Sequence, residues 1–454
     1  MKKIKSKIIR YLVLGLLLLL VFTVYLYSPI SQVGDSIWAA HTSVSIIKEG
    51  NTNLDEYSGE LARSQYGALD NINGHYYTIF PIGTSILSVP VIFPIIIFFE
   101  NKIDLIIESH FISVFFPSIK AHYESHYEII NSEKLGILAF NPDLQKFVAS
   151  FFVTATALFI YLISNFFLDS LSSLAVTFIF AFCTSSWSTA SRALWQHGPS
   201  MLMLSIGVYL LLVAKNKPWI VQFVGIPLAF SYVVRPTNSL SIIAISVFIF
   251  IKYRQYFLPF VAWGLTIGIP FILYNLSIYR QILSPYYQPS RLGSSSYFME
   301  ALLGNLISPS RGLFVFTPIF LFSLGGVIWL FKVKRISALD YCLLAILILH
   351  WLSISSFPHW WAGYSFGPRF FSDMIPYFIY FLVRMMQGIE TINWNRTKLF
   401  IVSIFVSFTM ISLFIHYRGA THYQVHDWNA TPVSVDQFPE RLWDWQDIQF
   451  MRGL

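Results

Sequence analysis

The chain has 454 residues, of which 55% are hydrophobic and 12% are charged, and its formal net charge is +7. Soluble domains carry about 25% charged residues, and a soluble fold could not bury so much apolar surface. This composition excludes a soluble multidomain enzyme and a disordered chain. Two cysteines in distant apolar runs, Cys183 and Cys342, exclude a disulfide scaffold. We therefore expect an all-α polytopic membrane protein.

Apolar runs recur along the chain at lengths near the 20 or so residues that a membrane-spanning helix needs. They predict about eleven transmembrane helices in a single transmembrane domain, 1–454. The predicted helices are 11–30, 147–167, 172–190, 199–214, 218–234, 238–251, 257–279, 313–330, 338–356, 370–387 and 398–415.

A twelfth apolar run, 84–99, is interpreted through the positions of the basic residues. If 84–99 does not cross the membrane, the basic N-terminus and the basic short loops share one side, which the positive-inside rule makes cytoplasmic. The loop clusters are Lys215/Lys217, Lys252/Arg254, Lys332/Lys334/Arg335 and Arg396/Lys398. The run 84–99 is then a re-entrant or interfacial helix within a first external loop, 31–146. The C-terminal tail, 416–454, is also external, and the positive charge reflects orientation and not a nucleic-acid partner.

Four arginines lie in Gly- or Pro-marked turns where predicted helices meet the external face: Arg192, Arg235, Arg311 and Arg369. The arginine guanidinium is a planar fork of donors that matches phosphate, so converging arginines suggest an anion site, with His197 as a further member. The alternative is that each arginine anchors its helix end among lipid headgroups. Asp373 lies four residues after Arg369 and is expected to pair with it across one helical turn.

Asp35 follows the first predicted helix directly, and a carboxylate in that position can act as a general base. The alternative is an N-cap for the amphipathic stretch 36–48. Glu56, Tyr57, His359 and Tyr364 are candidate substrate contacts, although a solvated loop also accounts for Glu56 and Tyr57. The sequence contains no HExxH motif and no Cys/His spacing typical of a metal site.

The order of these features resembles the GT-C class of integral membrane glycosyltransferases. An acidic residue directly after the first helix opens a long external loop, and the aromatic-proline turn 76–81 precedes a short apolar helix. The nearest branch resembles protein O-mannosyltransferases and lipid A aminoarabinose transferases, and four short motifs resemble uncharacterised bacterial members. Those motifs are 194–199, 235–238, 308–312 and 367–369. The resemblance covers nearly the whole chain.

The resemblance implies a polyprenyl-phosphate-linked sugar donor, a glycan, lipid or protein acceptor, and transfer on the extracytoplasmic face of a bacterial plasma membrane. It implies that Asp35 is the catalytic base. Two departures from the class, Gln196 and His197 in place of a second acid and Ser36 after Asp35, leave a divalent metal without a clear ligand set. We expect a single displacement with inversion. The alternative function is a transporter or flippase of lipid-linked sugars, and a non-catalytic membrane scaffold is the third.

Overall fold

The computed structural model describes residues 2–57, 68–100, 141–288 and 297–454, and the described chain is predominantly helical with one short hairpin. Its helices are α1 Lys2–Tyr27, α2 Ala39–Lys48, α4 Gly83–Glu100, α8 Asn141–Ser164, α9 Ser170–Phe182, α10 His197–Ala214, α11 Gly225–Val234, α12 Ser239–Lys252, α13 Phe257–Tyr279, α14 Phe298–Ile307, α15 Leu313–Phe316, α16 Leu321–Lys332, α17 Ala338–Ser355, α18 Ile375–Glu390, α19 Arg396–Thr421 and α20 Gln424–Asp427. Strands β1 Leu69–Ile72 and β2 His75–Thr78 form an antiparallel hairpin in which Leu69 pairs with Thr78.

Each predicted apolar run forms helix, but several runs are interrupted near one end. The run 172–190 leaves α-helix at Phe182 and continues as a π-helical turn, Ser186–Ala190. The run 313–330 is divided between α15 and α16 at Pro318, since proline lacks the backbone N–H that a continuous helix needs. The β hairpin and α14 were not predicted from the sequence.

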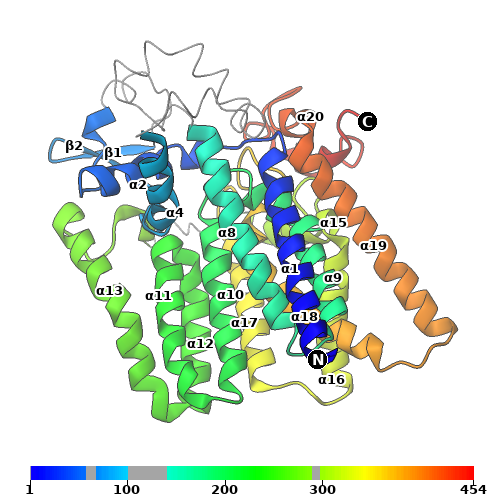
Figure 1. Cartoon of the computed structure of the whole chain (residues 1–454). Coiled ribbons are helices and arrows are strands. Elements are labelled where there is room, and N and C mark those ends of the chain that lie inside the picture. The colour runs from blue at the N-terminus through cyan, green and yellow to red at the C-terminus, as the bar shows by residue number, and fades with distance from the viewer. Residues whose placement is uncertain (1, 58–67, 101–140, 289–296) are drawn as a thin grey trace.

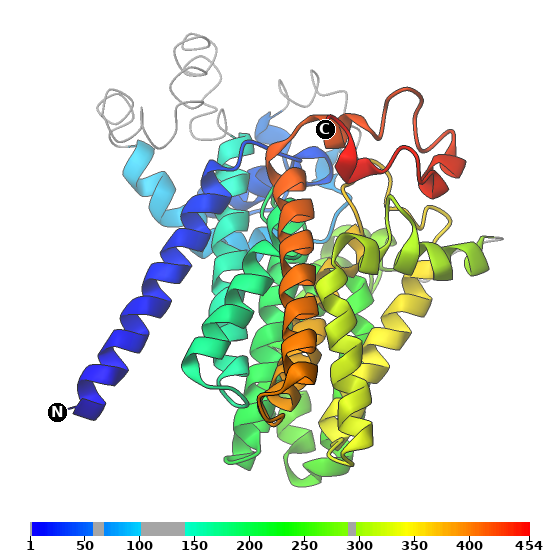
Figure 2. The ribbon, with the colours of Figure 1, turned by 90° about the vertical axis from the view of Figure 1, so that its right-hand side faces the viewer.

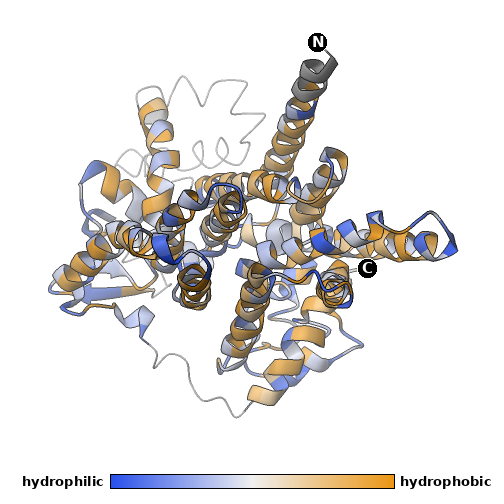
Figure 3. Ribbon diagram, turned by 90° about the horizontal axis from the view of Figure 1, so that it is seen from below, coloured by the Kyte–Doolittle hydropathy of each residue, from blue (hydrophilic) through white to orange (hydrophobic). Residues whose placement is uncertain are grey.

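Within the described residues, six helices are long and apolar enough to cross a membrane: α1, α8, α10, α13, α17 and α19, with the 3-10 turn before α13 included. Their outward faces are apolar as well. Leu16, Leu258 and Phe400 are each at least 66% exposed, and Figure 3 shows hydrophobic residues along the outer helices. So large an apolar exterior is stable only in lipid, and the chain is therefore an all-α membrane protein.

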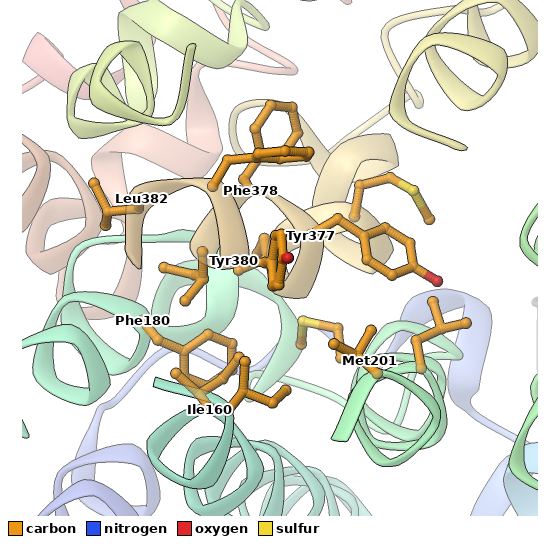
Figure 4. Packing of buried hydrophobic residues seen from close by; sticks show 14 of the residues in the cluster. Ile160, Phe180, Met201, Tyr377, Phe378, Tyr380 and Leu382 are labelled. Carbon is orange, nitrogen blue, oxygen red and sulfur yellow. The ribbon is translucent and has the colours of Figure 1, made fainter. Parts of the chain in front are cut away.

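The buried core of the bundle joins helices from both halves of the chain. Figure 4 shows Ile160, Phe180 and Met201 facing Tyr377 and Tyr380 of α18. Two glycines let helix backbones approach closely: a Cβ at Gly225 of α11 would lie 2.2 Å from the Phe260 carbonyl oxygen, and one at Gly326 of α16 would lie 2.1 Å from the Phe381 oxygen. Small residues at such crossings are typical of membrane helix packing.

The segment after α1 crosses one end of the bundle, where α2, the hairpin and α20 also lie (Figure 1). Figure 2 shows α19 running up to this end and α1 leaning away from the bundle at its N-terminus. Helix α4, which contains the run 84–99, packs against α2 and α11. Residues 58–67 and 101–140 of the predicted loop 31–146 lie outside the described residues.

Candidate functional site

A cavity of about 1200 Å³ opens at this end of the bundle, where several helix ends meet. Six of the predicted site residues line it: Asp35, His197, Arg235, His359, Tyr364 and Arg369. They come from five separate segments. These are the 3-10 helix Gly34–Ser36, the first residue of α10, the junction between α11 and α12, the loop after α17, and the 3-10 helix Arg369–Met374.

The cavity contains an ion pair between Asp35 and Arg369. Nη2 of Arg369 lies 2.5 Å from Oδ2 of Asp35, and Nε of Arg369 donates to Nε2 of His197 at 3.4 Å. The guanidinium carbon lies 3.9 Å from the centre of the Trp195 ring, which is close stacking. The Asp35 side chain is 37% exposed and that of Arg369 is 15% exposed. Arg369 is therefore held on two sides, while Asp35 stands nearer to solvent.

Asp35 is not the N-cap residue of a helix. Neither the 3-10 helix Gly34–Ser36 nor α2 has a side-chain N-cap hydrogen bond, and the N-cap residue of α2 is Trp38. The capping alternative to a functional role is therefore wrong. The expected pairing of Arg369 with Asp373 is also wrong, because Arg369 pairs with Asp35 and Asp373 faces other partners.

Asp373 is fully buried beneath the cavity and joins Arg235 to His197. Its Oδ1 lies 3.2 Å from Nδ1 of His197, and its Oδ2 lies 2.8 Å from Nε of Arg235. The second contact is an ion pair without an aligned hydrogen bond, because Nε of Arg235 donates to Thr237. Nδ1 of His197 lies between the Asp373 carboxylate, which only accepts, and Nη1 of Arg235 at 3.1 Å, which only donates, while Nε2 accepts from Arg369.

These contacts balance the charges of the site. Two guanidinium groups, Arg235 and Arg369, face two carboxylates, Asp373 and Asp35, across the neutral ring of His197. The two pairs differ in access, since the Asp373 side chain is 0% exposed and that of Asp35 is 37% exposed. An anion that enters the cavity can therefore compete with Asp35 more readily than with Asp373.

Arg192 does not line the cavity and is fully buried. It donates to the carbonyl oxygens of Tyr25 at 2.5 Å and Ser28 at 3.0 Å, at the C-terminal end of α1, and to the hydroxyl of Ser191. Burial lowers the pKa of Arg192 to about 9, and Tyr25 opposes the shift, so the guanidinium stays charged at neutral pH. Arg192 thus satisfies helix-terminal carbonyls and fixes the start of the segment that carries Asp35.

Arg311 has a similar structural role and does not line the cavity either. It is 1% exposed, and its guanidinium donates to the carbonyl oxygens of Trp361 and Gly363 and to side-chain oxygens of Asn429 and Gln449. It ties the loop after α17 to the C-terminal tail. The expectation of four converging arginines is therefore corrected to two, because Arg192 and Arg311 use their donors within the fold.

Glu56 and Tyr57 do not line the cavity. The Glu56 carboxylate accepts a hydrogen bond from the hydroxyl of Ser45 on α2, and the Tyr57 ring packs edge-on against His41 at 4.9 Å. Both residues belong to the packing around α2, so their expected contact with substrate is not supported by their position.

The cavity has two unlike walls. Phe80, Tyr232, Tyr286 and Tyr287 form an aromatic wall, with the rings of Phe80 and Tyr286 5.7 Å apart. The other wall is more polar and is formed by the loop after α17 and the tail: His359, Tyr364, Tyr423, His426 and Asn429. Sequence reasoning missed the aromatic wall, because tyrosines carry no pattern there that distinguishes them from core residues.

His426 of the tail holds the segment that leads to Asp35. Its Nε2 lies 2.8 Å from the carbonyl oxygen of Gly419, so Nε2 carries the proton and Nδ1 accepts from the amide of Gln32 at 2.8 Å. Burial lowers the pKa of this imidazole, and Gly419 and Asp427 oppose the shift. The neutral ring therefore fits both of its partners.

The residues around Asp35 do not fit a divalent cation. Within the described part of the chain, no three His, Cys, Asp or Glu side chains form a group that could hold a metal ion. The partner of Asp35 is the guanidinium of Arg369, whose charge disfavours a second cation nearby. We therefore derive no step through a metal.

Comparison with known proteins does not place the chain in a family. No protein-family model matches the sequence, and no curated protein matches it.

Proposed function

We propose that this protein is a GT-C-type membrane glycosyltransferase that transfers a sugar from a polyprenyl-phosphate-linked donor to an acceptor hydroxyl. The observation that carries the proposal is the pair of Asp35 with Arg369 in a cavity bounded by one aromatic and one more polar wall. A base and a phosphate-binding cation are the two groups that this transfer needs, and here they lie in contact.

In the proposed reaction the acceptor hydroxyl attacks the anomeric carbon while the bond from that carbon to the phosphate oxygen breaks. Asp35 takes the hydroxyl proton, and the polyprenyl phosphate leaves with the bonding electrons. No acid is needed to protonate the leaving group, in contrast to glycoside hydrolysis with its two carboxyl groups. One displacement inverts the anomeric configuration.

The charge on the leaving phosphate rises from about −1 in the donor diester to about −2 in the product, so fixed positive charge stabilises the transition state more than the ground state. Arg369 and Arg235 supply this charge. His197 and Asp373 position the two guanidinium groups through the contacts described above.

The two walls suggest where each substrate binds. The aromatic wall, with Tyr232 and Tyr287, suits the isoprenoid chain and the first sugar, because aromatic rings offer apolar area with a polar edge. The polar wall, with His359 and Tyr364, suits a hydroxyl-rich acceptor. A glycan, lipid or protein acceptor is compatible with this wall.

The full topology is part of the same proposal. We propose about eleven spanning helices, a cytoplasmic N-terminus, an external C-terminus and a run 84–99 that does not cross the bilayer. The cavity then opens on the extracytoplasmic side of a bacterial plasma membrane. A transporter of lipid-linked sugars would place its ionisable groups near the membrane midplane. Asp35, Arg235 and Arg369 instead lie at helix ends, which favours the enzyme.

Mass spectrometry of envelope glycans tests the proposal in cells. Cells with the wild-type gene should contain a sugar modification that is absent after deletion and absent again when the deletion is complemented with Asp35→Asn. Equal membrane levels of the two proteins, checked by immunoblot, make the comparison valid. Full restoration of the glycan by Asp35→Asn would contradict the assignment of Asp35 as the base.

A further inference from the structure

We propose that Arg369 is shared in turn by Asp35 and the donor phosphate, so that donor binding releases the Asp35 carboxylate to act on the acceptor. This inference rests on the proposed function and adds an order to it, with the donor bound before the acceptor is deprotonated.

The contacts of Arg369 show which partner can leave. Its guanidinium is stacked on Trp195 at 3.9 Å and donates through Nε to His197, which is itself held by the buried Asp373. Asp35 contacts Nη2 from a three-residue 3-10 helix and is the more exposed member of the pair. Arg369 is therefore the fixed partner, and Asp35 is the one that can be displaced.

The other ion pair of the site provides an internal contrast. Arg235 lies against Asp373, whose side chain is 0% exposed. A phosphate that took Arg235 would leave the Asp373 carboxylate buried and out of reach of water. Leaving a buried carboxylate without its partner is strongly unfavourable. Exchange is therefore confined to the pair of Arg369 and Asp35, and Arg235 adds charge without changing partners.

Charge explains why the exchange matters for catalysis. A carboxylate paired with a guanidinium is a weak base, because the neighbouring positive charge favours its ionised form. A phosphate that takes Arg369 removes this stabilisation from Asp35 and leaves a stronger base beside the sugar. The acceptor hydroxyl is consequently activated only when the donor is in place.

The same exchange assists product release. After transfer Asp35 holds the acceptor proton, is neutral and does not compete for Arg369, so the polyprenyl phosphate stays bound. When Asp35 loses that proton to water, the carboxylate returns to Arg369 and displaces the phosphate. In this cycle the Asp35 carboxylate itself displaces the product phosphate.

Binding of farnesyl phosphate to the purified full-length protein tests the inference, with quenching of tryptophan fluorescence or calorimetry as the readout. Asp35→Asn removes the competitor and should bind farnesyl phosphate up to about 5-fold more tightly than wild type, as expected for loss of a partly exposed ion pair. Asp35→Glu keeps the charge and serves as the matched control, with near wild-type affinity. Asp35→Ala should behave as Asp35→Asn does.

Two further probes separate the contributions to binding. Farnesol lacks the phosphate, so its affinity should be the same for wild type and for the Asp35 variants. Inorganic phosphate lacks the chain, so it should bind weakly, but its affinities should rank the variants in the same order as farnesyl phosphate does. Unchanged or weaker farnesyl phosphate binding in Asp35→Asn, with binding still lost in Arg369→Met, would overturn the exchange and leave the proposed donor site intact. Wild-type affinity for farnesyl phosphate in Arg369→Met would instead show that Arg369 is not part of a donor phosphate site.

Discussion

Arg192 and Arg369, which both lie in short Gly- or Pro-marked turns, should respond differently to the same substitution. Arg192→Met removes a fully buried guanidinium that satisfies the carbonyl oxygens of Tyr25 and Ser28. Each buried acceptor left without a partner costs about 1–3 kcal/mol, so the variant should lose about 2–6 kcal/mol of folding free energy. Arg369→Met should lose less, because Asp35 stays partly exposed to solvent and Nε2 of His197, the one buried acceptor that loses a donor, also lies 3.4 Å from Nη1 of Arg235.

Arg369→Met should instead lose function. One charge-assisted hydrogen bond to the donor phosphate contributes about 1.5–3 kcal/mol, which corresponds to a roughly 10- to 150-fold loss of rate or donor affinity. Thermal unfolding in detergent and farnesyl phosphate binding, measured on both variants, separate the two effects. A stable Arg192→Met protein that no longer binds farnesyl phosphate would refute the division of the arginines into structural and ligand-facing groups.

Three other predictions concern topology, pH and the buried carboxylate. A cysteine placed at Trp394, which is 74% exposed, should react with a membrane-impermeant reagent only from the cytoplasm, and one at Trp445 only from outside; labelling of both from one side would contradict the topology. Because burial lowers the pKa of His426 below its ordinary 6.5, unfolding takes up a proton on this ring, so its contribution to stability should fall as pH drops below about 6.5; thermal unfolding of His426→Gln should show a shallower decline between pH 7 and 5. Asp373→Asn leaves Arg235 without its buried partner and should cost about 3–5 kcal/mol of stability in the same unfolding measurement; an unchanged midpoint would show that the pair is unimportant.

The helices were predictable because membrane-spanning segments are long apolar runs, and each of the predicted runs forms helix. Their interruptions were less predictable, although Pro318 shows how a single residue divides one run into α15 and α16. The hairpin of β1 and β2 is marked by Asn73-Gly74, a strong signal for a two-residue turn that was overlooked among the apolar runs. The short helix α14 escaped prediction because no long apolar run marks it.

The candidate site was predictable only in part, because the sequence does not reveal what surrounds a side chain. Arg192 and Arg311 occupy short, Gly- or Pro-marked turns just as Arg235 and Arg369 do, yet distant carbonyl oxygens take up the donors of the first two. Asp373 was expected to pair locally with Arg369, but its nearest cation, Arg235, is distant in sequence. Local spacing identifies which residues are polar at helix ends and cannot decide between partners that the tertiary fold brings together.

The central claim is that this protein consumes a polyprenyl-phosphate-linked sugar. The most direct measurement follows the lipid product: purified protein is incubated with lipid-linked sugars and envelope material from deletion cells, and free polyprenyl phosphate is quantified by mass spectrometry. The wild-type protein should release polyprenyl phosphate together with a glycosylated acceptor of inverted anomeric configuration, and Asp35→Asn should be slower by about 10²- to 10⁴-fold. Equal release by the wild-type and Asp35→Asn proteins, or no release by either, would contradict the proposed transfer.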